Sequence, residues 1–243
     1  MPFKSQFIAY SIMLFSVLFL SSCGSMRTLE REAGLRKRSI SLADLGPKYL
    51  KLKNGDHDFF RKKSKRSKAP IKVRYRTFKI KKLDQFIKKS NVLYARFQYA
   101  EHSSDHFNEL LNDLVDRGAR HVSTKELNRA IRKRSTKDMK LRRKIDRALQ
   151  SLKLTSHSLK KMLSEAQDLI SMGDKVASDA VDTVKKQPTK AILAQKITLE
   201  SKTTLSRLRK VVRRLPRLIK KMGKNVKVAQ AASKIAKKYA KKK

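Results

Sequence analysis

The stretch LRRKIDRALQSLKLTSHSLKKMLSEAQDLISMGDKVASDAVDTVKK, residues 141–186, decides the fold that we expect for this chain. Small or apolar residues recur along it at alternating spacings of four and three, which is the pattern of a heptad seam. The seam comprises Leu141, Ile145, Ala148, Leu152, Thr155, Leu159, Met162, Ala166, Leu169, Gly173, Val176 and Ala180. It predicts a helix over 138–186, roughly 70–75 Å long at about 1.5 Å per residue, with Gly173 and Asp174 as a place where it could break.

A second seam of similar length follows the sequence Gln187-Pro188-Thr189. It comprises Ala194, Ile197, Ser201, Thr204, Leu208, Val211, Leu215, Leu218, Met222 and Val226. Proline is tolerated in the first turn of a helix and distorts a helix interior, so Pro188 predicts a turn near 187–189 and Pro216 predicts a kink. Two seams joined at one proline predict an antiparallel helical hairpin within residues 121–236.

A third helix is predicted within residues 71–120, after a short extended segment. Its apolar stripe follows a rotation of about 100° per residue and contains Phe86, Leu93, Phe97, Ala100, Ser104, Phe107, Leu111, Leu114 and Val115. Gly118 is a plausible stop for this helix. Because Thr155, Ser201 and Thr204 supply little apolar area to the hairpin seams, we expect the third helix to complete the bundle.

Two further patterns concern the ends and flanks of these helices. Ser123-Thr124-Lys125-Glu126 is a capping box, and Ser135-Thr136-Lys137-Asp138 is a weaker one. One flank of the third helix is acidic, and we expect it to face the basic helices of the hairpin. That flank contains Glu101, Asp105, Glu109, Asp113 and Asp116.

Composition supports the same fold class, an all-α, elongated helical-hairpin or coiled-coil bundle. The 243 residues include 62 Lys+Arg and 20 Asp+Glu, a formal net charge of +42, which disfavours a compact, neutral metabolic enzyme because the surplus charges repel. Gly 7, Pro 5 and Trp 0 disfavour a turn-rich all-β fold. The single cysteine excludes an internal disulfide and a Cys-rich zinc module.

The charge is concentrated at both ends of the chain. Residues 27–82 carry 20 basic and 5 acidic residues, and residues 188–243 carry 19 and 1. Residues 23–70 lack a sustained apolar period and predict a disordered basic tether. Alternating residues 49–53 and 71–75 flank Asn54-Gly55, so a weak hairpin is expected there. Residues 237–243 form a polybasic tail.

Residues 1–22 have the features of a secretory signal: Lys4, then an apolar run from Phe7 to Leu20 that is too short for an ordinary membrane span. The following Leu20-Ser21-Ser22-Cys23-Gly24 resembles the lipobox of bacterial lipoprotein precursors. The resemblance implies cleavage between Ser22 and Cys23, a diacylglyceryl group on the Cys23 thiol, and N-acylation such as palmitoylation. Gly24 in place of Asp implies the periplasmic face of the outer membrane if the source is Gram-negative.

The C-terminal helix is the strongest candidate for a binding site, because its cations have almost no acidic neighbours in sequence. We expect a polyanion to bind Arg207, Arg209, Lys210, Arg213, Arg214, Arg217, Lys220, Lys221, Lys224 and Lys227. Anionic phospholipid, lipopolysaccharide and cell-wall polymer are the candidates that an exported protein would meet. Nonspecific nucleic-acid binding, an acidic envelope protein as partner, and self-association through spare heptad positions remain open alternatives.

Two other kinds of site have weaker support. His102, His106 and Glu109 share one helical face at a spacing that divalent metals use, although polar outer-face residues explain the same pattern. The sequence contains no Walker or dinucleotide glycine loop and no Gly-x-Ser-x-Gly elbow. We therefore expect a non-enzymatic structural or adaptor protein without a metal or a cofactor other than the lipid on Cys23.

Overall fold

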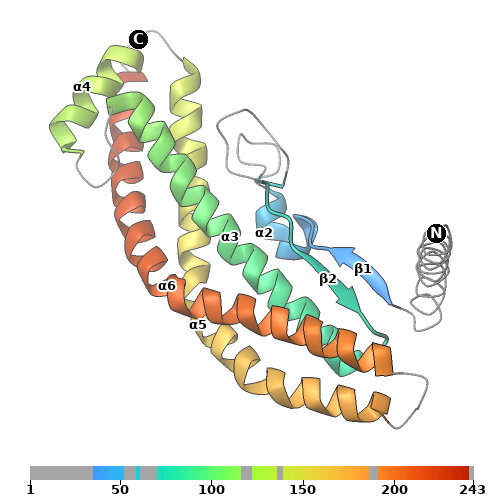
Figure 1. Cartoon of the computed structure of the whole chain (residues 1–243). Coiled ribbons are helices and arrows are strands. Elements are labelled where there is room, and N and C mark those ends of the chain that lie inside the picture. Colours follow the sequence, from blue (N-terminus) through green and yellow to red (C-terminus); the bar gives the residue numbers. More distant parts are fainter. Residues whose placement is uncertain are drawn as a thin grey trace, which may run out of the picture.

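The computed structural model describes residues 35–51, 59–60, 70–115, 122–135, 139–185 and 191–240. Its elements in chain order are β1 (Arg36–Ser39), a 3-10 turn (Ala43–Leu45), α2 (Pro47–Leu50), β2 (Arg74–Thr77), α3 (Lys81–Val115), α4 (Thr124–Ser135), α5 (Met139–Lys185) and α6 (Ala191–Ala240). Long helices dominate the described chain (Figure 1). The protein is therefore an all-α helical bundle, as the two seams predict.

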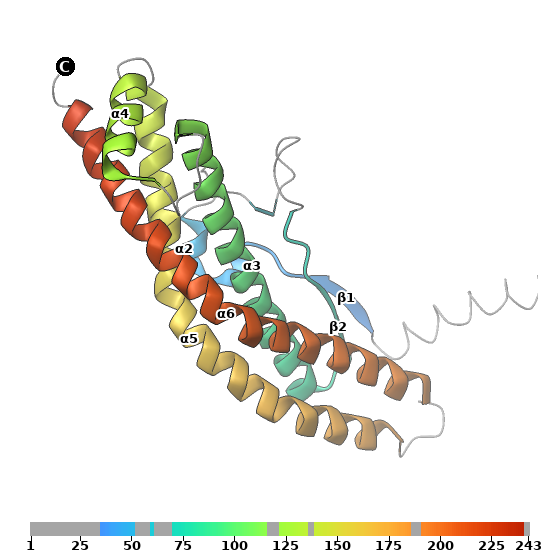
Figure 2. The same ribbon diagram turned by 60° about the vertical axis from the view of Figure 1, so that its left-hand side comes forward.

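The bundle is built on the antiparallel pair α5 and α6, with α3 lying alongside both (Figures 1 and 2). Eleven of the twelve predicted α5 seam residues are buried, and Val176 is half-buried. In α6, Ile197, Leu208 and Val211 are completely inaccessible, and only Val226 of its seam is not fully buried. The heptad prediction is thus confirmed, while the turn expected at 187–189 lies outside the described residues.

Gly173 lies where α5 packs closely against both α6 and α3, and α5 continues through it without a break. A Cβ at this position would come within 2.7 Å of Leu205 Cδ2 in α6 and of Phe86 Cζ in α3. Real Cβ atoms do not make contacts that short, so glycine is required here for close packing. The suggestion that the helix could break at Gly173 and Asp174 is wrong.

Pro216 lies inside α6, which continues on both sides of it as one helix. Proline has no N–H, so the carbonyl of Val212 loses its usual intrahelical partner. Pro216 is exposed, which places the disturbed turn on the solvent side of α6. Figure 1 shows α5 and α6 curving together along their length, so the pair bends while its seam stays closed.

The apolar stripe of α3 forms the central part of the core. Phe97, Phe107 and Leu111 are fully buried, as the stripe predicts. The helix buries more than one stripe, however, because Tyr99 and Ile87 are also inaccessible. Two buried serines, Ser103 in α3 and Ser151 in α5, satisfy each other by a hydrogen bond of 2.8 Å. The Gly118 stop lies outside the described residues, since α3 is described only to Val115.

Helix α4 begins as its capping box predicts. The Ser123 Oγ accepts a hydrogen bond from the Glu126 N–H at 3.2 Å, and the Glu126 carboxylate accepts one from the Ser123 N–H at 3.0 Å. These reciprocal bonds satisfy backbone donors that the first helical turn leaves free. The second, weaker box at 135–138 falls largely outside the described residues.

The structure differs from the predicted tether over residues 35–51. Strand β1 pairs with β2 in antiparallel register, with Arg36 opposite Thr77 and Arg38 opposite Tyr75. The hairpin expected around Asn54 is not formed as predicted, because Tyr49 and Leu50 belong to α2 while Arg74 and Tyr75 pair with β1. Isolated apolar residues anchor this segment on α3: Leu45 and Tyr49 are buried, and the Tyr49 ring meets Tyr99 edge-on at 5.2 Å.

Candidate polyanion-binding surface

The structure divides the ten predicted polyanion-binding residues of α6 into two rows. The inner row comprises Arg207, Lys210, Arg214 and Lys221, all of which contact α3. The outer row comprises the other six residues, Arg209, Arg213, Arg217, Lys220, Lys224 and Lys227, which are all exposed. Spacings of four and three place the outer row along one face of the helix for about 27 Å at about 1.5 Å per residue.

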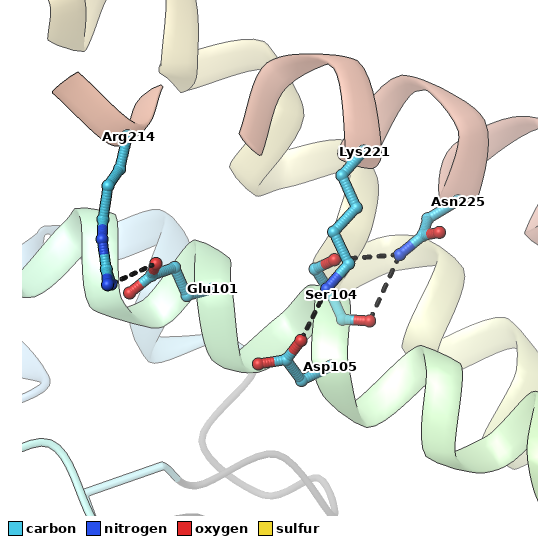
Figure 3. A network of polar contacts seen from close by, with 6 residues as sticks. All are labelled: Glu101, Ser104, Asp105, Arg214, Lys221 and Asn225. Carbon is cyan, nitrogen blue, oxygen red and sulfur yellow. Dashed lines mark hydrogen bonds and ion pairs between the residues drawn. The ribbon is translucent and has the colours of Figure 1, made fainter. Parts of the chain in front are cut away.

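Carboxylates of α3 neutralise the two C-terminal cations of the inner row, Arg214 and Lys221 (Figure 3). Arg214 Nη1 lies 3.5 Å from Glu101 Oε1, and Lys221 Nζ lies 2.7 Å from Asp105 Oδ1. The predicted acidic flank is confirmed at these two positions. Glu109 instead lies 4.0 Å from His106 on its own helix, and Asp116 is outside the described residues. The outer row has no ion pair with any acid in the described part of the chain.

A buried amide fixes how α3 and α6 align beside these ion pairs. Asn225 Nδ2 donates to the Ser104 carbonyl at 3.2 Å and to Ser104 Oγ at 2.9 Å (Figure 3). Asn225 is only 2% exposed and Ser104 is fully buried. A buried polar contact between helices sets their register, because any shift leaves the groups without partners. This register keeps Lys221 beside Asp105 and the outer row in solvent.

Removing this amide should destabilise the bundle. Asn225→Ala would leave Ser104 Oγ without its partner from α6 and would remove buried side-chain volume, so we expect a loss of about 1–3 kcal/mol in the free energy of unfolding. Urea unfolding followed by circular dichroism measures it. Lys224→Ala, at the exposed neighbouring position, is the control and should stay within about 0.5 kcal/mol of wild type. Equal stability of Asn225→Ala and wild type would contradict the role given to the amide.

The two N-terminal cations of the inner row, Arg207 and Lys210, contact neutral groups of α3 and β2 instead of acids. Arg207 Nη1 donates to the Asn91 Oδ1 and, at 3.0 Å, to the carbonyl of Arg74. Lys210 Nζ donates to the Tyr94 hydroxyl at 3.3 Å. Both cations lie 5.8 Å from the centre of the Tyr94 ring, where the ring attracts positive charge. These contacts hold the two side chains in place while leaving their charges unneutralised by a direct ion pair.

Glu200 is the acid that acts on this part of α6. Burial raises the pKa of its carboxyl, while the N–H of Arg76 and the positive charges of Arg207 and Arg76 oppose that rise. Its hydrogen bond goes to the backbone of β2 rather than to Arg207. The negative charge of Glu200 therefore partly offsets the positive charges of Arg207 and Arg76 without forming an ion pair with the inner row.

The fold gathers further cations at one end of the bundle, which sequence reasoning missed. Helix α4, the start of α5 and the end of α6 lie together there (Figures 1 and 2), and Tyr239 of α6 donates to Asn128 of α4 at 3.0 Å. Exposed cations come from all three helices, among them Arg129, Arg134, Arg143, Lys144, Lys234 and Lys237. Cations distant in sequence thus gather at this end of the bundle.

The candidate metal residues are not arranged as a metal site. Phe59 stacks on His102 with ring centres 5.3 Å apart and meets His106 at 6.4 Å, so an aromatic ring covers both imidazoles. Both histidines are half-buried. Across the described ranges, no group of three or more His, Cys, Asp or Glu side chains could hold a metal ion.

Comparison with protein-family models, curated proteins and solved structures found no significant match. None of the helices in the described part of the chain is both long enough and apolar enough to cross a membrane. Cys23, Ser22 and the other residues of the segment that resembles a lipobox lie outside the described residues.

Proposed function

We propose that this protein is a lipid-anchored structural or adaptor lipoprotein whose helical bundle attaches electrostatically to anionic material of the cell envelope. The outer row of α6 carries the proposal: six exposed cations lie on one helical face without an ion pair to the described acids. Each Lys or Arg held near an anionic surface contributes about 1 kcal/mol of attraction. A row of six is sufficient for binding that a small number of scattered charges would not support.

The lipobox supplies the second part of the proposal. A diacylglyceryl group and an N-acyl chain on Cys23 would anchor the chain, because each buried CH₂ contributes about 0.8 kcal/mol and two or more chains give stable attachment. The described bundle begins at residue 35, twelve residues beyond Cys23. At about 3.3–3.6 Å per extended residue, that linker keeps β1 within roughly 45 Å of the membrane surface.

Single-stranded nucleic acid is a less suitable ligand for the outer row. Sequence-tolerant binding of single strands depends on aromatic side chains that stack with bases. The segment from Arg209 to Lys227 contains no aromatic residue. A secretory signal would also place the bundle among lipid and cell-wall anions first. The favoured ligands are therefore phospholipid headgroups, lipopolysaccharide phosphates and cell-wall polymers.

Co-sedimentation tests the proposal directly. The full chain is mixed with zwitterionic phosphatidylcholine vesicles, anionic phosphatidylglycerol vesicles, lipopolysaccharide, purified cell wall and duplex DNA at two salt concentrations. We expect binding to at least one envelope anion, weak binding to zwitterionic vesicles, and a decrease as salt screens the charges. The proposed function would be contradicted if the protein bound none of the envelope anions, or if it bound DNA alone.

A further inference from the structure

The inner row of α6 occupies heptad positions at which α3 supplies two different kinds of partner. Arg207, Arg214 and Lys221 are seven residues apart and all face α3. At Arg214 and Lys221 the partner is a carboxylate, which cancels the positive charge. At Arg207 the partner is the neutral amide of Asn91, which orients the guanidinium and leaves its charge available.

Asn91 is well suited to hold Arg207 rigidly. It is completely buried, and its Nδ2 donates to the Ile87 carbonyl at 2.8 Å, so its oxygen points consistently toward one donor. Arg207 uses the same nitrogen, Nη1, for both Asn91 and the Arg74 carbonyl. Its Nε and Nη2 make no hydrogen bond within the described part of the chain. A guanidinium edge of this kind matches two oxygens of a phosphate group.

A hollow of about 470 Å³ lies beside this guanidinium. Its lining comprises Tyr94, Lys202, Thr203, Ser206, Arg207 and Lys210, and it includes no Asp or Glu. Three cations converge on it from successive turns of α6. The Tyr94 hydroxyl accepts from Lys210 and can donate its own hydrogen, and the Ser206 hydroxyl offers a second neutral donor.

We propose that this hollow binds a phosphate group through Arg207, Lys210 and Lys202, assisted by the hydroxyls of Tyr94 and Ser206. The three positive charges, partly offset by the negative charge of Glu200, suit a group that carries one to two negative charges. The group is either the phosphate of a lipid headgroup or that of a soluble phosphate ester. This inference rests on the proposed function in naming phosphate as the anion, but it concerns residues outside the outer row.

Isothermal titration of the full chain with glycerol 3-phosphate tests the inference, with chloride as the competing anion held constant. Wild type should bind, and Arg207→Gln should weaken binding at least tenfold. Asn91→Asp should weaken it similarly, because a carboxylate there would neutralise Arg207 as Glu101 neutralises Arg214. Glu101→Gln is the matched control and should leave the affinity within about twofold, as should neutralising the outer row.

Further measurements distinguish a lipid phosphate from a soluble phosphate ester and show whether each variant is folded. Competition between glycerol 3-phosphate and phosphatidylglycerol vesicles indicates a lipid headgroup, whereas glycerol 3-phosphate binding without competition indicates a soluble ester; both support a phosphate site.

Circular dichroism establishes that each variant is folded, and Ser206→Ala, at an exposed position, provides a second variant if Asn91→Asp unfolds. The inference is overturned if wild type does not bind glycerol 3-phosphate at millimolar concentration, or if Arg207→Gln binds it equally well. Either result would leave attachment through the outer row unaffected.

Discussion

Neutralising the outer row is expected to abolish most binding of this protein to anionic vesicles. The variant replaces Arg209, Arg213, Arg217, Lys220, Lys224 and Lys227 with glutamine. Six cations at about 1 kcal/mol each set an upper limit, and even half of that total corresponds to a loss of affinity of about 100-fold. Because these side chains are exposed and glutamine is a good helix former, the fold should be retained. Co-sedimentation with phosphatidylglycerol vesicles measures the effect.

The control removes six charges from other exposed positions. Lys89, Lys153, Lys160, Lys161, Lys175 and Lys185 are all exposed, and glutamine at these positions lowers the net charge by the same amount. If the outer row binds as a continuous surface, the control should lose much less affinity than the outer-row variant. Equal losses in the two variants would show that net charge alone drives attachment, which contradicts the role given to the outer row.

Alanine should have opposite effects at two glycines inside the long helices. In both cases alanine stabilises the helix itself by about 0.5–1 kcal/mol. At Gly173 the new Cβ would overlap Leu205 and Phe86, and overpacking of a core costs about 1–3 kcal/mol. We expect Gly173→Ala to lower the free energy of unfolding by about 1–2 kcal/mol, which corresponds to roughly 2–8 °C in Tm for a domain of this size.

Gly223 is the matched control, because a Cβ at this position meets no atom within 4 Å. Gly223→Ala should therefore raise the Tm by about 1–4 °C through helix propensity alone. Differential scanning calorimetry of the two variants at the same pH and salt makes the comparison. A Tm for Gly173→Ala as high as that for Gly223→Ala would mean that the three helices do not meet closely at Gly173.

The helices could be predicted because their sequence pattern is local and periodic. The α5 seam continues for more than five heptads, and burial of Leu152, Thr155 and Leu159 follows it closely. The segment 35–51 could not be predicted in the same way. Its buried residues, such as Leu45 and Tyr49, acquire their partners from α3, and pairing of β1 with β2 joins residues almost 40 positions apart. No short window of sequence carries that information.

The candidate site could be predicted in composition but not in arrangement. The basic helix and the acidic flank of α3 are visible in the sequence, and Glu101 and Asp105 do meet α6. Which cations they neutralise depends on the register between α3 and α6, which Asn225 and Ser104 fix from positions more than 100 residues apart. The sequence likewise does not reveal that Arg207 lies beside the neutral Asn91, whereas Arg214 and Lys221 lie beside acids of α3.

Membrane fractionation of cells producing wild type or Cys23→Ser, combined with the mass of the mature N-terminus, tests most directly whether a lipid anchor holds this cationic bundle at the envelope. The account predicts that wild type begins at Cys23, carries the mass of a diacylglyceryl group and an N-acyl chain, and remains with membranes after a high-salt wash. Cys23→Ser should keep an uncut leader without the lipid. A wild-type chain that retains residues 1–22 and an unmodified Cys23 would contradict the account.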